Sequence, residues 1–573
     1  MKRAEKKQQG MWDILIPILL VIAVLPWIVR LAIYSCGYSQ YDWYSTNDVL
    51  TDLYCYYKSY FLDVIGIFAG IILVFRLALY KEKTKNMKIY IPIGIYCVFV
   101  LLSTIFSVNT AASLQGNFES FESCLVLFAY SILSVYAYQI MEYERDYKIV
   151  WYAIIGISVF FLIVGGFQIF EHDLMDFSWV QRLLMDKEEF DIYAGEIEDA
   201  FTGNNVYLTL YNPNYAGIAL NMLFAVIFIM CLTEKDKKKK IGYGILAAGV
   251  FVLIWFTYSR ASLLAVIITV VLTVIFWRRE GLAFGFAAGL ILVIALIGVD
   301  ASLDFKYLSR MIDKNNREPL ESMVTDEKGI HICYEDENYL LYIENDSLVC
   351  TAESKETPLC VEEGEEMTLP MGEDTKAFFY GEKIYLYVAE NTLTFIRENG
   401  TYYYETIHGK VTTMEPIERV DLHGLEYLGS ARGYIWSRVL PLLKDYIFIG
   451  SGPDTFAEVF PQQDYAGKVV YSDRPDMVIE KGHNDYLTKW IQTGGISFIC
   501  IVVFYFLFIK EGAGAYANKE KMHNRIGFGC YLACISYMFT GLFNDSTLQT
   551  SPLFWVFAGI ALSSIIIEKE FSV

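Results

Sequence analysis

The sequence is poor in basic residues and in the cysteine and histidine patterns of metal sites. It has 46 Lys and Arg against 66 Asp and Glu, a formal net charge of −20, and only six histidines. This balance gives no indication of nucleic-acid binding. The eleven cysteines include no C-x-x-C pair, the spacing typical of zinc and dithiol sites. We expect neither kind of site, and the spacing leaves a bridge between Cys36 and Cys55 open.

Apolar residues are abundant and fall in blocks of about twenty, the length of a helix that crosses a hydrocarbon core. Hydrophobic residues make up 55% of the chain, and the mean hydropathy is +0.35. A basic start precedes the first block, which is too long for a signal peptide and lacks a cleavage site. Twelve spans are predicted, at 12–34, 60–80, 89–107, 121–140, 149–170, 213–233, 241–258, 262–278, 282–299, 486–509, 526–543 and 552–567.

The basic residues between the spans predict the topology. Lysine and arginine concentrate in the links after even-numbered spans, at 81–88, 235–240, 278–279 and 510–525, whereas the link at 142–148 is mixed. Because cytoplasmic loops carry an excess of Lys and Arg, both termini are predicted to be cytoplasmic. The protein is expected in the cytoplasmic membrane as a multi-pass protein.

A long polar insertion separates the ninth and tenth spans. Between residues 313 and 426 it has 26 acidic and 9 basic residues, so most of the negative charge lies here. Short apolar and aromatic runs predict strands at 330–334, 339–343, 383–388, 392–397 and 401–406, with a hairpin turn at 398–400.

The predicted organisation is therefore an all-α polytopic membrane protein with a small extracytoplasmic β-rich insertion at about 315–420. Residues 1–299 hold spans one to nine, 300–430 the insertion, 431–485 an amphipathic or re-entrant loop, and 486–573 spans ten to twelve.

Five polar motifs lie on the predicted outer face, at span ends or in the 431–485 loop. They are Asn-Pro-Asn-Tyr-Ala-Gly at 212–217, Thr-Tyr-Ser-Arg-Ala-Ser at 257–262, Arg-Gly-Tyr-Ile-Trp at 432–436, Ile-Gly-Ser-Gly-Pro-Asp-Thr-Phe at 449–456 and His-Asn-Asp-Tyr-Leu at 483–487. Each also has a structural interpretation. Arg260 suits an interfacial anchor, Asn212 a helix cap, and His483 a structural histidine. A helix start at the outer surface also favours an anion.

Taken in order, these motifs resemble those of the O-antigen ligase and polymerase superfamily, the Wzy/WaaL-like membrane glycan transferases. The resemblance covers roughly 200–300 and 428–565, and the β-rich insertion departs from the family pattern. The resemblance implies a GT-C-like helical fold. It also implies transfer of a glycan from undecaprenyl diphosphate to an acceptor hydroxyl, with inversion at the anomeric carbon.

The resemblance also implies roles for single residues. Arginine binds phosphate oxygens bidentately and stays charged, which suits Arg260 and Arg432, with Arg438 as a further candidate. Histidine titrates near neutral pH and suits a general base, which is the role of His483. Supporting residues are Asn212, Asn214, Tyr258 and Asn484. No cofactor and no metal are expected, and the acceptor is a glycan, a wall polymer, a lipid or a protein.

Three alternatives stay open. A polymerase joins repeat units carried on the same lipid, and the motifs do not separate it from a ligase. A lipid-linked glycan flippase would carry charged residues at mid-membrane, whereas the predicted spans are nearly free of charge at their centres. A membrane sensor would use the β-rich insertion to bind a ligand, yet every predicted cytoplasmic segment is short.

Overall fold

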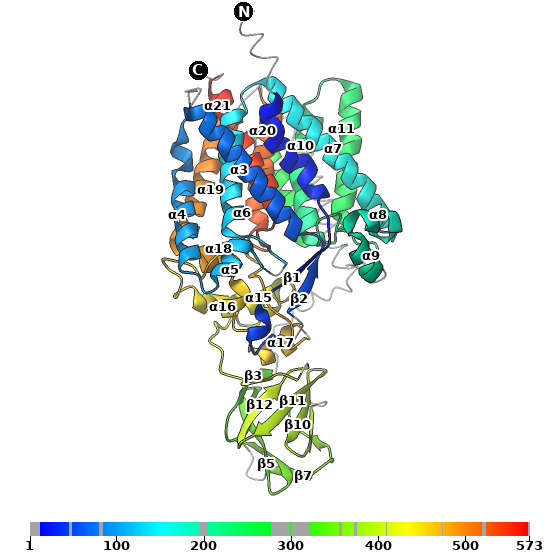
Figure 1. Cartoon of the computed structure of the whole chain (residues 1–573), viewed down its shortest axis with the longest axis vertical. Helices are drawn as coiled ribbons and strands as arrows, with labels where there is room; N and C mark the ends of the chain where they lie inside the picture. Colours follow the sequence, from blue (N-terminus) through cyan, green and yellow to red (C-terminus); the bar gives the residue numbers. More distant parts are fainter. Residues whose placement is uncertain are drawn as a thin grey trace, which may run out of the picture.

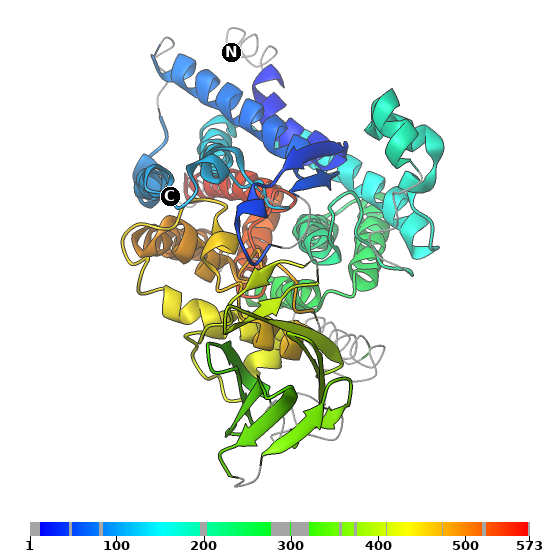
Figure 2. The same ribbon diagram turned by 60° about the horizontal axis from the view of Figure 1, so that its bottom comes forward.

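The computed structural model places a bundle of helices at one end and a β sandwich at the other (Figure 1). It describes residues 12–44, 48–78, 84–117, 119–194, 203–276, 298, 320–354, 358–371, 375–407, 409–472, 474–517 and 523–570. Short helices lie between the two parts, and Figure 2 shows them beside the sandwich.

Seven helices among the described residues are long and apolar enough to cross a membrane. They are α3 (Tyr56–Ala78), η5 with α4 (Met87–Tyr90 and Ile91–Ile105), α7 (Glu144–Ile169), α10 (Pro213–Thr233), α11 (Lys237–Phe256), α19 (Gly495–Tyr516) and α21 (Ser551–Glu570). Shorter apolar helices are Asp13–Trp27, α6 (Cys124–Ile140) and α12 (Arg260–Phe276). The protein is thus a polytopic membrane protein by the length and composition of its helices.

The count of twelve spans stays a prediction. The predicted eleventh span coincides with α20 (Arg525–Thr540), which has only 16 residues. The predicted ninth span, 282–299, lies outside the described residues except for Gly298.

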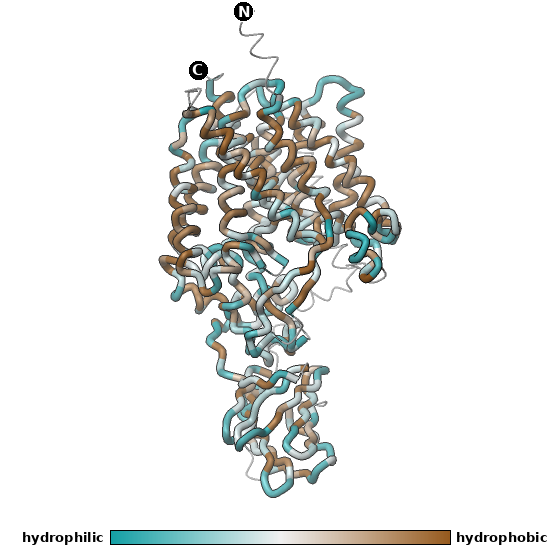
Figure 3. Tube along the Cα trace, viewed as in Figure 1, coloured by the Kyte–Doolittle hydropathy of each residue, from teal (hydrophilic) through white to brown (hydrophobic). Residues whose placement is uncertain are grey.

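Helices α10, α20 and α21 form the centre of the bundle, and nearly all of their side chains are buried. Small residues allow close packing, as expected between membrane helices: a Cβ at Gly559 of α21 would overlap the backbone of Ser134 in α6. By contrast, α3 exposes large apolar side chains such as Val64, Ile67 and Phe68. Figure 3 shows the apolar residues concentrated along the helices, which is the surface that lipid chains would cover.

The predicted boundaries are wrong in two places. The first span was expected to continue to Tyr34, but the helical segments η1 (Trp12–Leu15), α2 (Ile16–Leu19), η2 (Leu20–Val24) and η3 (Leu25–Trp27) end at Trp27. Pro26 lies in this last turn, and a proline cannot donate a backbone hydrogen bond. The chain then forms β1 (Ala32–Ser35), which pairs with β2 (Val49–Asp52).

The tenth span begins at Gly495 instead of Tyr486. A separate helix, α18 (Asp485–Thr493), precedes it, and Gly494 between them has φ +93°. Only glycine adopts this conformation without strain. The loop before α16 (Phe456–Val459) fills the break, because Ser451 donates its N–H to the Ile491 carbonyl at 2.8 Å.

The β sandwich consists of two antiparallel meanders that face each other. The five-stranded sheet runs in the order β3 (Leu320–Thr325), β4 (Ile330–Tyr334), β5 (Glu337–Glu344), β6 (Ser347–Ala352) and β7 (Leu359–Glu362). The six-stranded sheet comprises β8 (Met367–Thr368), β9 (Lys376–Tyr380), β10 (Lys383–Val388), β11 (Asn391–Glu398), β12 (Thr401–Glu405) and β13 (Val411–Thr412). The five predicted strands and the 398–400 turn are confirmed, with Glu398 opposite Thr401.

The sandwich is joined to the bundle through α15 (Leu428–Leu442) and α17 (Tyr465–Ser472). Tyr465, Ala466 and Val469 of α17 belong to the apolar core of the sandwich. The other helices among the described residues are α5 (Thr110–Gln115), η4 (Tyr38–Gln40), η6 (Leu174–Asp176), α8 (Ser178–Leu184), α9 (Lys187–Tyr193) and η7 (Leu425–Tyr427).

Candidate active site

A histidine–aspartate pair lies where the helical bundle meets the connecting loops. The Nδ1 atom of His483 lies 2.8 Å from Oδ2 of Asp545. Asp545 comes from the loop between α20 and α21, and this loop is tied to the start of α18. The Asp485 N–H donates to the carbonyls of Gly541 and Asn544. His483 itself has φ +46°, a conformation that a histidine rarely adopts and that the surrounding hydrogen bonds maintain.

This pair differs from the two other His–Asp pairs among the described residues. His331–Asp326 and His423–Asp421 are exposed, with 46% and 61% of their aspartate side chains accessible. Asp545 is only 2% exposed, while the His483 side chain is 39% exposed. One side of the imidazole thus contacts a buried carboxylate, and the ring still reaches solvent.

The Asp545 carboxylate is held in its charged form. Burial alone would raise its pKa, but His483, Lys481 and Arg432 together keep it below its ordinary value. A charged carboxylate accepts the N–H of Nδ1, so a neutral His483 ring has its lone pair on Nε2. The arrangement therefore provides a proton acceptor at Nε2 and a negative charge behind it.

Lys481 is a buried cation two residues before His483. Its Nζ donates to the Glu119 carbonyl at 3.3 Å and lies 5.8 Å from the centre of the Tyr215 ring. Burial would lower its pKa, but Tyr215 and the carboxylates of Glu480 and Glu119 hold it well above the ordinary value. Burial and Glu119 raise the pKa of Glu480. Lys481 is therefore charged and fixed in place.

Contacts made by the predicted motifs, or by residues just before the 483–487 motif, bring four of them together. Gly217 of α10 packs so closely on Ser262 and Thr257 that an added Cβ would overlap the Ser262 side chain. The Lys481 Nζ lies over the ring of Tyr215, which is on the same turn of α10 as Gly217. Trp436 of α15 donates its Nε1–H to the Gly482 carbonyl at 3.0 Å.

The fifth motif, at 449–456, packs against α18. Gly450 lies so close to the α18 backbone that an added Cβ would overlap Gln492. Asp454 accepts the Asn117 N–H at 2.6 Å, and burial raises the pKa of Asp454 to about 7. This motif fixes the connecting loops and contributes no group to the His483–Asp545 pair.

Two of the predicted arginines, Arg432 and Arg260, lie in motifs that the structure brings together. Arg432 acts electrostatically on Asp545, and its Nη1 donates to the Gly429 carbonyl at 2.8 Å. Arg260 begins α12, in the turn that packs on α10 through Ser262. Both residues are partly exposed.

Arg438 has a structural place instead. It is 2% exposed, its Nε donates to Asp464 at 2.8 Å, and its guanidinium lies 4.5 Å from the Tyr434 ring centre. These contacts join α15 to the segment that precedes α17. The substrate-binding role predicted for Arg438 therefore has no support in its surroundings.

The predicted polar residues mostly serve local structure. Asn212 caps α10 and accepts the Asn214 N–H at 2.9 Å. Asn484 caps α18 and donates to the Leu542 carbonyl at 3.0 Å. The Tyr258 hydroxyl donates to Asn204 at 2.8 Å. Asn484 thus positions His483, and Asn214 stands partly exposed on the first turn of α10.

Asp545, Lys481 and Glu480 were not among the residues predicted for the site. Asp545 follows Asn544 at the predicted outer end of a span, the criterion that selected His483, and applying it to every span would have found it. Lys481 and Glu480 precede the His-Asn-Asp motif directly, but their pairing with Glu119 depends on a contact across the chain.

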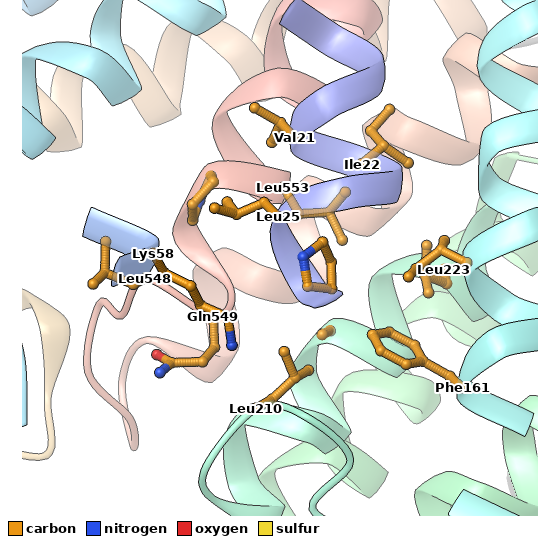
Figure 4. Close-up of a pocket in the computed structure, with 14 residues that line it drawn as sticks. Val21, Ile22, Leu25, Lys58, Phe161, Leu210, Leu223, Leu548, Gln549 and Leu553 are labelled. Atoms are coloured by element: carbon orange, nitrogen blue, oxygen red, sulfur yellow. The ribbon is translucent and has the colours of Figure 1, made fainter. Parts of the chain in front are cut away.

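An apolar cavity lies next to the loop that carries Asp545. Figure 4 shows it between the first helical segment, α10 and α21, with Lys58 and Gln549 among its lining residues. Val21, Leu223 and Leu553 represent its apolar walls. The Lys58 side chain lines one side of the cavity, and its Nζ donates to the Thr209 carbonyl at 2.7 Å.

The cysteines are thiols: Cys36 and Cys55 form no bridge, and Cys55 instead accepts a hydrogen bond from Gln549 at 3.0 Å. Within the described residues, no group of three or more His, Cys, Asp and Glu side chains is arranged to hold a metal ion. No family model matches the chain, and no curated protein and no solved structure matches it.

Proposed function

We propose that this protein transfers a glycan from a membrane-bound lipid diphosphate, of the undecaprenyl type, to an acceptor hydroxyl on the outer face of the cytoplasmic membrane. The observation that carries this proposal is the His483–Asp545 pair beside Arg432 and Lys481. This pair supports the proposal because it combines an imidazole with nearby cations at one end of a polytopic bundle. The ordered motifs and their resemblance to the O-antigen ligase and polymerase superfamily supply the donor class.

The proposed reaction is a direct displacement. The acceptor oxygen forms a bond to the anomeric carbon, and the bond between that carbon and the diphosphate oxygen breaks. The hydroxyl proton moves to Nε2 of His483, and the departing electron pair stays on the diphosphate. Such a displacement inverts the anomeric centre. Asp545 stabilises the imidazolium that forms, while Arg260 and Arg432 neutralise the negative charge that develops on the leaving group.

The orientation in the membrane rests on the charged links. The basic link at 235–240 joins α10 to α11 at the end of the bundle remote from the β sandwich (Figure 1). Because basic loops stay cytoplasmic, the site and the sandwich would face outward.

The test is complementation of a deletion strain with His483→Ala or Arg432→Ala, measuring surface glycan and lipid-linked precursor. Both variants should lose glycan and accumulate precursor, whereas His423→Ala, which alters an exposed pair, should restore the wild-type level. Normal glycan with stably inserted His483→Ala would refute the proposal. Full-length carrier-linked chains indicate a ligase, single repeat units a polymerase, and precursor confined to the inner leaflet a flippase.

A further inference from the structure

The outer face of the six-stranded sheet presents an aromatic surface to solvent. The sandwich core takes the alternate residues of each strand, such as Phe379, Ile384 and Phe395. The residues between them point outward, and many are aromatic. The aromatic face consists of Phe378 and Tyr380 on β9, Tyr385 and Tyr387 on β10, and Tyr403 on β12.

The register of the strands places these rings side by side. Tyr385 lies opposite Phe378, and their rings stack with centroids 4.9 Å apart and planes 15° from parallel. The Tyr380 ring meets Phe378 edge-on at 6.0 Å. Tyr380 is 56% exposed and Tyr387 37%. With strands about 4.8 Å apart, the face from β9 to β12 is long enough for several units of an extended chain.

Exposed aromatic residues in such a cluster are uncommon on a surface that binds nothing, because contiguous apolar patches usually mark interaction sites. Hydroxyl groups border the rings: Thr394 lies opposite Tyr385, and Thr392 opposite Tyr387. Thus the face combines flat apolar rings with hydrogen-bonding groups at their edges. Sugars have the matching chemistry, with apolar C–H faces and hydroxyls around the rim.

The charges on and around the face disfavour a polyanionic partner. Lys383 pairs with Glu405 at 2.6 Å, and Lys376 pairs with Glu366 at 3.2 Å, so both lysines of the face are neutralised. The surrounding segment has 26 acidic and 9 basic residues between 313 and 426. This excess repels polyanions such as nucleic acids, teichoic acids and anionic membranes.

We propose that the aromatic face binds a neutral polysaccharide chain by stacking sugar rings on Phe378, Tyr385 and Tyr387. The identification of this chain as the donor or acceptor glycan rests on the proposed function, whereas binding itself does not. The surface would hold the glycan away from the membrane while its reacting end lies near His483.

The test measures binding by biolayer interferometry, with the full-length chain in nanodiscs. The ligand is neutral surface polysaccharide purified from the cells that make this protein. Tyr385→Ala should weaken binding about tenfold, the loss typical of a truncated central aromatic anchor. Tyr385→Phe retains the ring and should bind nearly as wild type. Tyr342→Ala, on β5 of the other sheet, is the matched control and should leave binding unchanged. Circular dichroism verifies folding of each variant.

Either of two polysaccharide-binding results would overturn the inference: no binding of the neutral polysaccharide by the wild type, or equal binding by wild type and a folded Tyr385→Ala. Retention of a protein at this face instead of the polysaccharide would also overturn it. The two proposals fail separately. Normal transfer by His483→Ala together with binding that depends on Tyr385 would refute only the transferase, while loss of transfer together with binding insensitive to Tyr385 would refute only the surface.

Discussion

Replacing Asp545 by asparagine tests the histidine pair with the smallest change of shape. The wild-type carboxylate accepts the N–H of His483 Nδ1 and stabilises the ring when it takes a proton. An asparagine amide removes the charge, and if its NH2 group donates to Nδ1, the ring proton moves to Nε2. The imidazole would then have no lone pair facing the acceptor hydroxyl.

The expected loss follows from the geometry. Two charges 2.8 Å apart interact by about 6 kcal/mol at an effective dielectric constant of about 20 and by about 1.5 kcal/mol in water. The His483 side chain is 39% exposed, so solvent partly screens this interaction. We therefore take an interaction energy between the two limits, about 3 kcal/mol. This corresponds to about a hundredfold slower transfer, within the range of about 10²–10⁴ for a general base.

The assay measures transfer of radiolabelled lipid-linked glycan to acceptor by protein in proteoliposomes, with thermal unfolding as the control for stability. Asp421→Asn and Asp326→Asn make the same substitution in the two exposed His–Asp pairs and should retain full activity. If folded Asp545→Asn transfers glycan at the wild-type rate, the pair does not act as the base and the proposed mechanism is wrong.

Two further predictions concern the buried charges around the site. Lys481→Met leaves the carboxylates of Glu480 and Glu119 without their cation and should lower stability by about 3–5 kcal/mol. Lys444→Met, which breaks an exposed pair, should leave the melting temperature nearly unchanged. Equal melting temperatures of the two variants would contradict this. Because burial raises the folded-state pKa of Asp454 to about 7, the native protein binds its proton more tightly than the unfolded chain. Its stabilisation is therefore lost as pH rises through about 7. The melting temperature should fall more between about pH 5 and about pH 8 in the wild type than in Asp454→Asn, and equal pH dependence would refute the assignment.

Hydrophobic length and strand alternation predicted the general fold. Blocks of about twenty apolar residues located helices such as α10, which matches its predicted bounds of 213–233, because a hydrocarbon core sets their length. Alternation of buried and exposed residues located β4, β10 and the β11–β12 hairpin. The break at Gly494 was not predicted, because hydropathy does not distinguish a short interfacial helix followed by a span from one long span.

The candidate site was only partly predictable. Position at a span end identified His483, the family resemblance identified Arg432, and the residue types made their chemistry plausible. Two findings required tertiary contacts. One is the pairing of His483 with Asp545 across 62 residues of chain, and the other is the burial of Arg438 against Asp464. Sequence patterns show which residues can bind phosphate, but not which of them are already neutralised by a neighbour.

Helix α17 prevents the β sandwich from being separated from the rest of the protein. Its side chains complete the core of the β sandwich, and the Arg438–Asp464 pair ties the residues before it to α15. The sandwich is therefore not a detachable module, although its strands form one continuous segment of the chain. A deletion of 320–412 would leave Tyr465, Ala466, Val469 and Val470 facing water, an apolar surface that favours aggregation. Point substitutions on the outer faces of the sheets avoid this problem and are the better means of dissecting its contribution.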